Sequence, residues 1–212
     1  HLLRDSWEAR DDYIEVILDR IFANRAAFLE RHATRPLTRE EQVHAIQCLE
    51  IQRHTLLMYT SCGWFFDEIS GIESVQVLQY AGRVIQQARD LYRVDLEGGF
   101  LEILERAKSN LAEHGDGRRI YEKFVKPAMV DWEKVTAHYA ISSLFSDPSE
   151  QSTIYCFSFE NQEYESHAAG NARFAFGRSQ VTSQITGESA TLTFAALHLG
   201  DHNVNGGVRF DS

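Results

Sequence analysis

The run from Ser61 to Glu68 combines residue types that could bind a sugar. It follows a long helical pattern, and Gly63 frees the backbone from helical geometry, so the rings after it need not face a helix core. Aromatic rings can stack on the apolar C–H faces of sugars, and carboxylates accept hydrogen bonds from hydroxyl groups. The candidate sugar-binding residues in this run are Ser61, Trp64, Phe65, Phe66, Asp67 and Glu68.

The same run also fits a hydrophobic hinge between two packed helices. In that interpretation the aromatic rings are buried, and Asp67 and Glu68 cap the next helix. Spacing alone favours the hinge, because aromatic side chains are mostly buried in folded proteins. Whether Trp64 faces a groove with convergent polar groups or lies flat on an apolar patch separates a sugar-binding cleft from a surface that docks another protein.

A second group of polar residues lies in the helical pattern before this run. Glu50, Arg53 and His54 are spaced i, i+3 and i+4, so all three can touch on one helical face. Ser61 follows His54 by seven residues, on nearly the same face. The group could line a substrate cleft or form an internal ion pair. The pattern favours the ion pair slightly, because partly buried charges on helices usually have partners.

Motifs for catalysis or metal binding are missing from the sequence. His198, Asp201 and His202 span a predicted turn without a third convergent group, so local hydrogen bonding is favoured over a metal site. The sequence contains no nucleophile elbow, phosphate-binding loop or dinucleotide fingerprint. No carboxylate pair can be assigned as a glycosidase acid and nucleophile. We therefore expect no metal, no cofactor and no catalytic residue in this chain.

Composition limits the partners. The chain has 212 residues and a net charge of −10, which disfavours nucleic acid and anionic membrane surfaces. No run of 18 apolar residues is present, so we expect no membrane span. Cys48, Cys62 and Cys156 are odd in number and lack a CxxC spacing, which indicates buried thiols in a reducing cytoplasm.

Hydrophobic spacing predicts about six helices between residues 6 and 145. The first begins near Ser6 and ends before Pro36, and the second begins at Thr38, where Glu41 completes a capping box. A third helix is predicted to open at Ser70, again as a serine followed three residues later by a glutamate.

Beyond residues 146–149 the spacing changes to the two-residue period of β-strands. Strands are predicted at 153–159, 174–176, 180–186 and 190–199, with turns at Gly187-Glu188 and Gly200-Asp201 and a hairpin at Asn205-Gly206. The fold class expected is α+β, with a helical domain over 1–147 and an antiparallel β segment over 148–212. The first residues enter a helix at once and the last stop as a strand resumes, so we expect a truncated fragment of a longer protein.

Three segments carry a resemblance to a known family. The specific one is Leu49–Glu68, and Trp7–Ile14 and Leu197–Asn203 support it. Together they resemble the uncharacterised C-terminal domain found downstream of glycoside hydrolase family 57 polysaccharide-deacetylase-like barrels in bacteria and archaea. In that family an incomplete barrel is closed by a helical region, on which a Ser-Asp-Trp-type motif contributes a substrate-contacting aromatic ring. Ser61 to Trp64 resembles this motif, but Gly63 stands where the motif has its aspartate.

The resemblance implies an accessory part of a family-57-like hydrolase or 4-α-glucanotransferase. The parent protein would hydrolyse or transfer α-glucosidic bonds with retention, using catalytic carboxylates of the upstream barrel, so this chain would be inactive alone. The partners implied are an α-glucan and that barrel. The alternative is a non-catalytic helical module whose exposed apolar surface docks on the barrel or on a second subunit, as in a homodimer.

Overall fold

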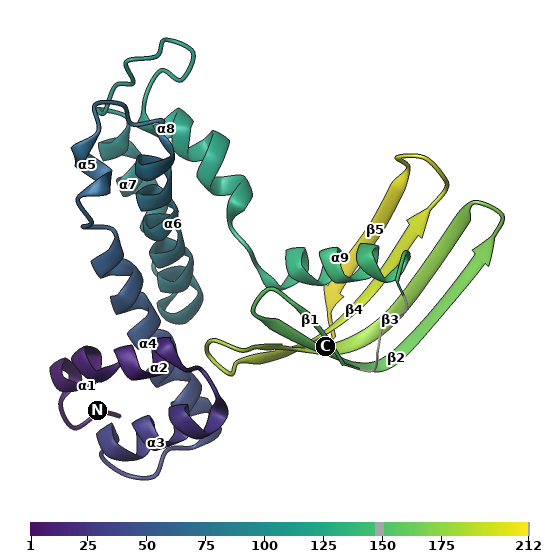
Figure 1. Cartoon of the computed structure of the whole chain (residues 1–212), viewed down its shortest axis with the longest axis horizontal. Helices are drawn as coiled ribbons and strands as arrows, with labels where there is room; N and C mark the ends of the chain where they lie inside the picture. Colours follow the sequence, from purple (N-terminus) through teal and green to yellow (C-terminus); the bar gives the residue numbers. More distant parts are fainter. Residues whose placement is uncertain (147–150, 212) are drawn as a thin grey trace. The chain divides into compact units, whose positions relative to one another are not determined.

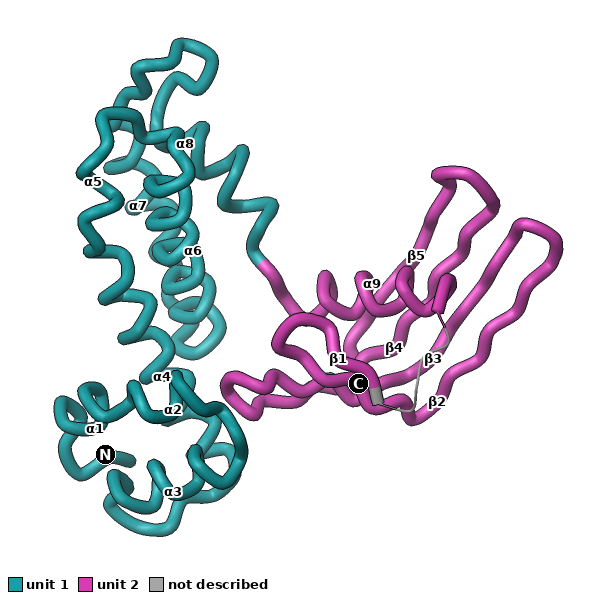
Figure 2. Tube along the Cα trace, viewed as in Figure 1, with its two compact units in different colours: residues 1–129 teal, residues 130–212 magenta. Residues whose placement is uncertain are grey.

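A computed structural model describes residues 1–146 and 151–211 of the chain. The chain forms two compact units, His1–Met129 and Val130–Ser212 (Figure 2). The first is helical, and the second combines one helix with an antiparallel sheet. The predicted α+β class is therefore confirmed, with helices first and strands after residue 150.

The helical unit is built around two long helices that pack side by side, α4 (Arg39–Leu57) and α6 (Ile72–Tyr92) (Figure 1). The short helix α5 (Cys62–Phe65) lies in the segment of chain that connects them. The other elements of this unit are α1 (Ser6–Asp12), α2 (Ile14–Leu18), α3 (Phe22–His32), α7 (Glu97–Leu104), α8 (Gly117–Ile120), the π-helix η1 (Tyr121–Val125) and the 3-10 helix η2 (Lys126–Ala128).

Two apolar clusters hold this unit together. The first cluster joins α4 to the segment that contains α1, α2 and α3. Its large buried members are Tyr13, Val16, Phe28, Ile46 and Leu49. A second cluster joins α6, α7 and η1, and its buried members are Leu101, Tyr121 and Val125. Because burial of apolar side chains is the main favourable contribution to folding, these clusters fix where the ends of α4 and α6 lie.

The first predicted helix is divided into three. Asp5 caps α1, since its carboxylate accepts hydrogen bonds from the next backbone amides; Ser6 is therefore not the cap. The chain breaks first at Tyr13, between α1 and α2, and again after α2, where Asp19 is extended and the Asn24 side chain donates to the carbonyl of Asp19 at 2.8 Å. The break after α2 depends on a polar side chain, which hydrophobic spacing does not register.

The start of α4 agrees with the sequence. Thr38 and Glu41 form both hydrogen bonds of a capping box, so that prediction is confirmed. The start of α6 does not agree, because Gly71 is the cap residue and no side chain caps this helix. Ser74 donates instead to the carbonyl of Glu68 at 3.4 Å.

The second unit is a five-stranded antiparallel sheet with α9 (Trp132–Ser143) against one face (Figure 1). Its strands pair in chain order and are β1 (Gln151–Ile154), β2 (Phe157–Ala169), β3 (Ala172–Ser183), β4 (Ser189–His198) and β5 (Val204–Phe210). Tyr139 of α9 stacks on Phe159 with ring centroids 4.3 Å apart and meets Phe194 edge-on. Since α9 shares its core with the sheet, the units divide after Met129, whereas the predicted division was at residue 147.

The strand boundaries correct several predictions. Residues 153–159 form two strands, because the chain turns at Tyr155, whose φ is 54°. The two short strands predicted at 174–176 and 180–186 belong to one strand, β3, which ends at Ser183. The predicted turns at Gly187 and Gly200 are present, with φ values of 78° and 104°. Asn205-Gly206 lies inside β5 and pairs with β4, so it is not a hairpin turn.

No helix in the described part of the chain is both long and apolar enough to cross a membrane. No disulfide joins the three cysteines, but the expectation that their thiols are buried is wrong for Cys62, which is exposed.

Candidate functional site

The aromatic run lies on α5, in the connection between α4 and α6. The backbone amides of Trp64 and Phe65 donate to the carbonyl of Ser61 at 3.1 and 2.9 Å, which closes a single helical turn. A side chain at Gly63 would place its Cβ 3.1 Å from a methyl group of Val77 on α6. Gly63 therefore lets the backbone of α5 approach α6 closely.

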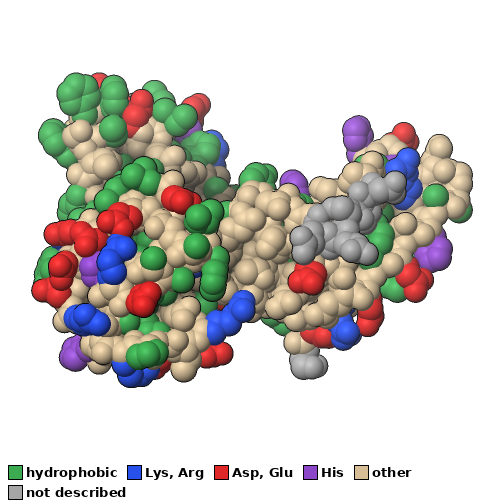
Figure 3. Space-filling model, turned by 60° about the horizontal axis from the view of Figure 1, so that its bottom comes forward, with side chains coloured by type: hydrophobic (Ala, Val, Ile, Leu, Met, Phe, Trp, Pro, Cys, Tyr) green, Lys and Arg blue, Asp and Glu red, His purple; other side chains and the backbone are tan. Residues whose placement is uncertain are grey.

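The aromatic rings of α5 point to solvent. Trp64 is 74% exposed and Phe65 72% exposed, while Phe66 is 48% exposed and meets Phe65 edge-to-face at 5.2 Å. Hydrophobic side chains are visible on the surface of the helical unit in Figure 3. The buried hinge favoured by spacing is therefore wrong for these rings, although α5 does connect two packed helices.

The two carboxylates after the rings differ in their surroundings. Glu68 accepts hydrogen bonds from the Ser109 hydroxyl and the Asn110 amide, both at 2.7 Å. The bond from Ser109, with further bonds from backbone amides, lowers the pKa of Glu68 to about 2. Asp67 is exposed, and its backbone carbonyl accepts from the Asn110 side chain at 2.5 Å.

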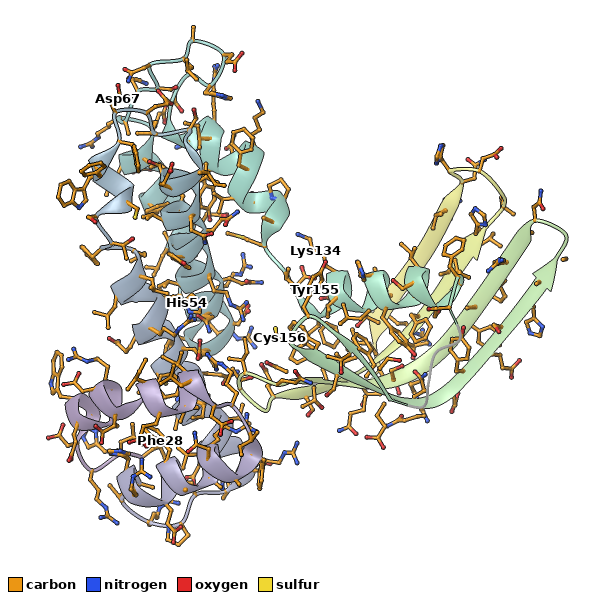
Figure 4. The ribbon with its side chains drawn as sticks, in the orientation of Figure 1. Phe28, His54, Asp67, Lys134, Tyr155 and Cys156 are labelled. Atoms are coloured by element: carbon orange, nitrogen blue, oxygen red, sulfur yellow. The ribbon has the colours of Figure 1, made fainter. Side chains whose placement is uncertain are left out.

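Glu68 therefore anchors the connection to the loop after α7, whereas the Asp67 carboxylate is exposed beside the rings. Figure 4 shows Asp67 in the connection that follows α5, at the end of the α4–α6 pair. The anchoring residues Ser109 and Asn110 were not predicted as part of the site. Their contact with Glu68 spans 41 and 42 residues, and no local pattern encodes it.

The second predicted group is an internal ion network. Glu50 is 1% exposed, and its carboxylate accepts from the Tyr13 hydroxyl at 2.7 Å and pairs with Arg20 at 2.9 Å. Burial first, and then the Glu50 carboxylate, raise the pKa of Tyr13, so this hydroxyl remains a donor. For Arg20, burial opposes the charge, but Glu50 and Tyr13 together outweigh it and raise the pKa of Arg20.

Arg53 and His54 complete this network on α4. Arg53 donates to Glu50 at 3.4 Å, and Nδ1 of His54 lies 2.7 Å from the Glu50 backbone oxygen. Burial lowers the pKa of His54, with a smaller contribution from neighbouring arginines. Figure 4 shows His54 along α4, away from Asp67. Because α4 ends at Leu57, Ser61 does not continue the face that carries these residues. Spacing could not have revealed the contribution of Tyr13 and Arg20.

The His198, Asp201 and His202 group shows local hydrogen bonding. Nε2 of His198 lies 3.1 Å from the backbone oxygen of Asp201. Among the described residues, no group of three or more His, Cys, Asp or Glu side chains could hold a metal ion.

The comparisons with known proteins give one match. A family model described as "Domain of unknown function (DUF3536)" matches residues 1–212. No curated protein matches the chain, and no solved structure matches it.

Proposed function

This chain belongs to the DUF3536 family, and from the exposed rings of α5 we propose that its helical unit supplies a carbohydrate-binding surface. In the proposal, the surface completes the α-glucan cleft of a family-57-like glycoside hydrolase or glucanotransferase. The catalytic carboxylates belong to a barrel outside this chain. The chain binds and positions the glycan and does no chemistry by itself.

The observation that carries the proposal is the exposure of Trp64. A tryptophan side chain covers about 150–250 Å² when it is buried, and leaving one in water forgoes that stabilisation. Here 74% of the residue is exposed, in a connection that Glu68 anchors through Ser109. An exposed indole offers a flat apolar face on which a sugar ring can stack.

The polar neighbours suit a neutral ligand. Asp67 offers an exposed carboxylate that can accept hydrogen bonds from sugar hydroxyls. The Glu68 carboxylate already accepts hydrogen bonds from Ser109 and Asn110, so its role is to anchor the connection that carries the rings. Arg53 pairs with the Glu50 carboxylate, and His54 contacts the Glu50 backbone oxygen, so the proposal leaves these three residues out of the glycan contacts.

The test compares two exposed tryptophans of the helical unit. Trp64→Ala should weaken binding of maltoheptaose by roughly tenfold, since an aromatic contact of about 0.5–1.5 kcal/mol corresponds to a 2- to 12-fold change. Trp7→Ala is the matched control, because Trp7 lies on α1 and is 70% exposed. It should leave the affinity unchanged. Isothermal titration calorimetry measures the maltoheptaose affinity of each variant, first in this chain alone and then in the protein that contains the barrel.

The same variants test the rival hinge interpretation through stability. About a quarter of the Trp64 surface is covered, so its loss should cost only about 1 kcal/mol at roughly 25 cal/mol per Å². A core tryptophan would cost about 3–5 kcal/mol. If Trp64→Ala binds maltoheptaose as tightly as the unchanged protein does, the carbohydrate proposal is wrong.

A second candidate function is docking on a protein partner, either the barrel or another copy of the chain. It is favoured by further exposed apolar side chains on the helical unit, among them Leu18, Phe22 and Ile72, each at least 72% exposed. Apolar side chains that form one contiguous patch mark protein interfaces, and docking requires that these side chains do so. Docking predicts that Trp64→Ala weakens association with the partner and leaves glycan affinity unaltered.

A further inference from the structure

A hollow of about 640 Å³ opens on the helical unit where α4 meets the first residues of the chain. This volume lies in the range of small-molecule sites, which is about 300–1,000 Å³. Leu2, Leu3 and Ala45 form its apolar part. Glu40, His44 and Cys48 also line it, and they are spaced four residues apart on α4. One face of α4 therefore presents a carboxylate, an imidazole and a thiol to the same hollow.

The thiol of Cys48 has two polar neighbours from different helices. Nε2 of His44 lies 3.7 Å from its sulfur, within the range of a sulfur hydrogen bond. The hydroxyl of Tyr92, at the end of α6, lies 3.0 Å from the same sulfur. Cys48 is half-buried at the wall of the hollow, so it is shielded but reachable.

These contacts match what a reactive thiol needs. The thiolate is the nucleophile, and a nearby imidazole can take the thiol proton and stabilise the resulting charge. The hydrogen bond to Cys48 raises the pKa of Tyr92 to about 12, so the tyrosine keeps its proton at neutral pH. A protonated hydroxyl can donate to a thiolate, which stabilises the charged form further.

We propose that Cys48 is a nucleophilic thiol, and that a small neutral or cationic disulfide enters this hollow and forms a mixed disulfide with it. The Cys48 proton moves to Nε2 of His44, and the thiolate attacks one sulfur of the disulfide. A new S–S bond forms to Cys48 while the original S–S bond breaks. The leaving thiolate then takes the proton from His44, and a second thiol can reverse the exchange.

The preference for a neutral or cationic disulfide follows from the charges of the lining. Glu41 is paired through both carboxylate oxygens with Arg35, at 2.8 and 2.5 Å. Hydrogen bonds from its own backbone amide and from Thr38 lower the pKa of Glu40, which keeps this second carboxylate charged. The charged Glu40 at the wall attracts an ammonium group and repels a carboxylate on the ligand, while the imidazoles of His1 and His44 complete the titratable lining.

The experiment measures mixed-disulfide formation on the folded protein at pH 7 with cystamine, a cationic disulfide. Mass analysis of the peptides gives separate rates for Cys48 and for Cys62, which is exposed on α5 and is the internal control. A neighbouring base activates a thiol by taking its proton as the sulfur attacks. Cys48 has His44 within reach, so we expect it to react about tenfold faster than Cys62. The anionic dithiodiglycolate should react with Cys48 more slowly than cystamine does.

Two variants distinguish activation from simple accessibility. His44→Gln and Tyr92→Phe should each bring the Cys48 rate down toward that of Cys62, while the Cys62 rate and the circular dichroism spectrum stay unchanged. A Cys48 rate at or below that of Cys62 in the unaltered protein overturns the proposal, and so does an unchanged Cys48 rate in both variants. The result is independent of glycan binding, because neither residue belongs to α5.

Discussion

Replacing the buried carboxylate of Glu50 should destabilise the helical unit strongly. In Glu50→Gln the charge that faces Arg20 at 2.9 Å and Arg53 at 3.4 Å disappears. Breaking a buried ion pair by removing one partner costs about 3–5 kcal/mol, since the other charge stays desolvated. The side chains of Arg20 and Arg53 remain 24% and 32% exposed, so water can reach them in part. We therefore expect a loss at the lower end, about 3 kcal/mol.

Thermal unfolding followed by circular dichroism at 222 nm measures this loss. For a chain of about 150–250 residues, each kcal/mol lowers the melting temperature by about 2–4 °C, so Glu50→Gln should lower it by about 6–12 °C. Glu15→Gln is the matched control, because the ion pair of Glu15 with Arg31 has side chains 51% and 49% exposed. An exposed pair contributes only about 0.2–1 kcal/mol. Equal losses for the two variants would refute the internal network.

Two further predictions concern other parts of the chain. Gly177→Ala should destabilise the sheet unit by about 1–3 kcal/mol in urea unfolding, because the new Cβ would lie 2.5 Å from the carbonyl oxygen of Glu163. Gly207→Ala, with no heavy atom within 4 Å of its Cβ, should be tolerated, and equal losses would contradict the packing argument. Glu68 should titrate near pH 2 in an NMR titration, so its stabilising contribution is complete above its unfolded pKa of 4.5 and is lost as the pH falls toward 2. Ser109→Ala should raise that midpoint, and an unshifted midpoint would show that the Ser109 hydroxyl is not the cause.

Sequence patterns within a few residues were enough to predict the start of α4 and the order of helices and strands. The capping box at Thr38 depends on residues three apart, and the change of period after residue 146 separates helices from strands directly. The break between α2 and α3 was not predicted, since the Asn24 side chain stabilises it, and the cap of α1 by Asp5 was not predicted either. The packing of α9 on the sheet was not predicted for another reason. Helical spacing shows that a helix has an apolar face, but not which core that face joins.

The candidate site was predictable in its residues and not in its environment. The sequence placed Trp64 after a glycine break, but it could not show that the ring is exposed, because exposure depends on the packing of α5 on α6. Glu68 and Asp67 are adjacent and chemically alike, yet Ser109, forty-one residues away, binds only the Glu68 carboxylate. Glu50 is likewise defined by Tyr13, which contacts it from 37 residues away.

The proposed glycan surface is tested most directly by the indole N–H signals of the protein in an NMR titration with maltoheptaose. The chain has three tryptophans, and each gives one such signal. Trp7 is on α1, and Trp132 packs edge-to-face on Phe157 at 5.5 Å in the sheet unit. We predict that the Trp64 signal shifts in a saturable way while the Trp7 and Trp132 signals stay in place. A Trp64 signal that remains fixed at saturating maltoheptaose would contradict the account.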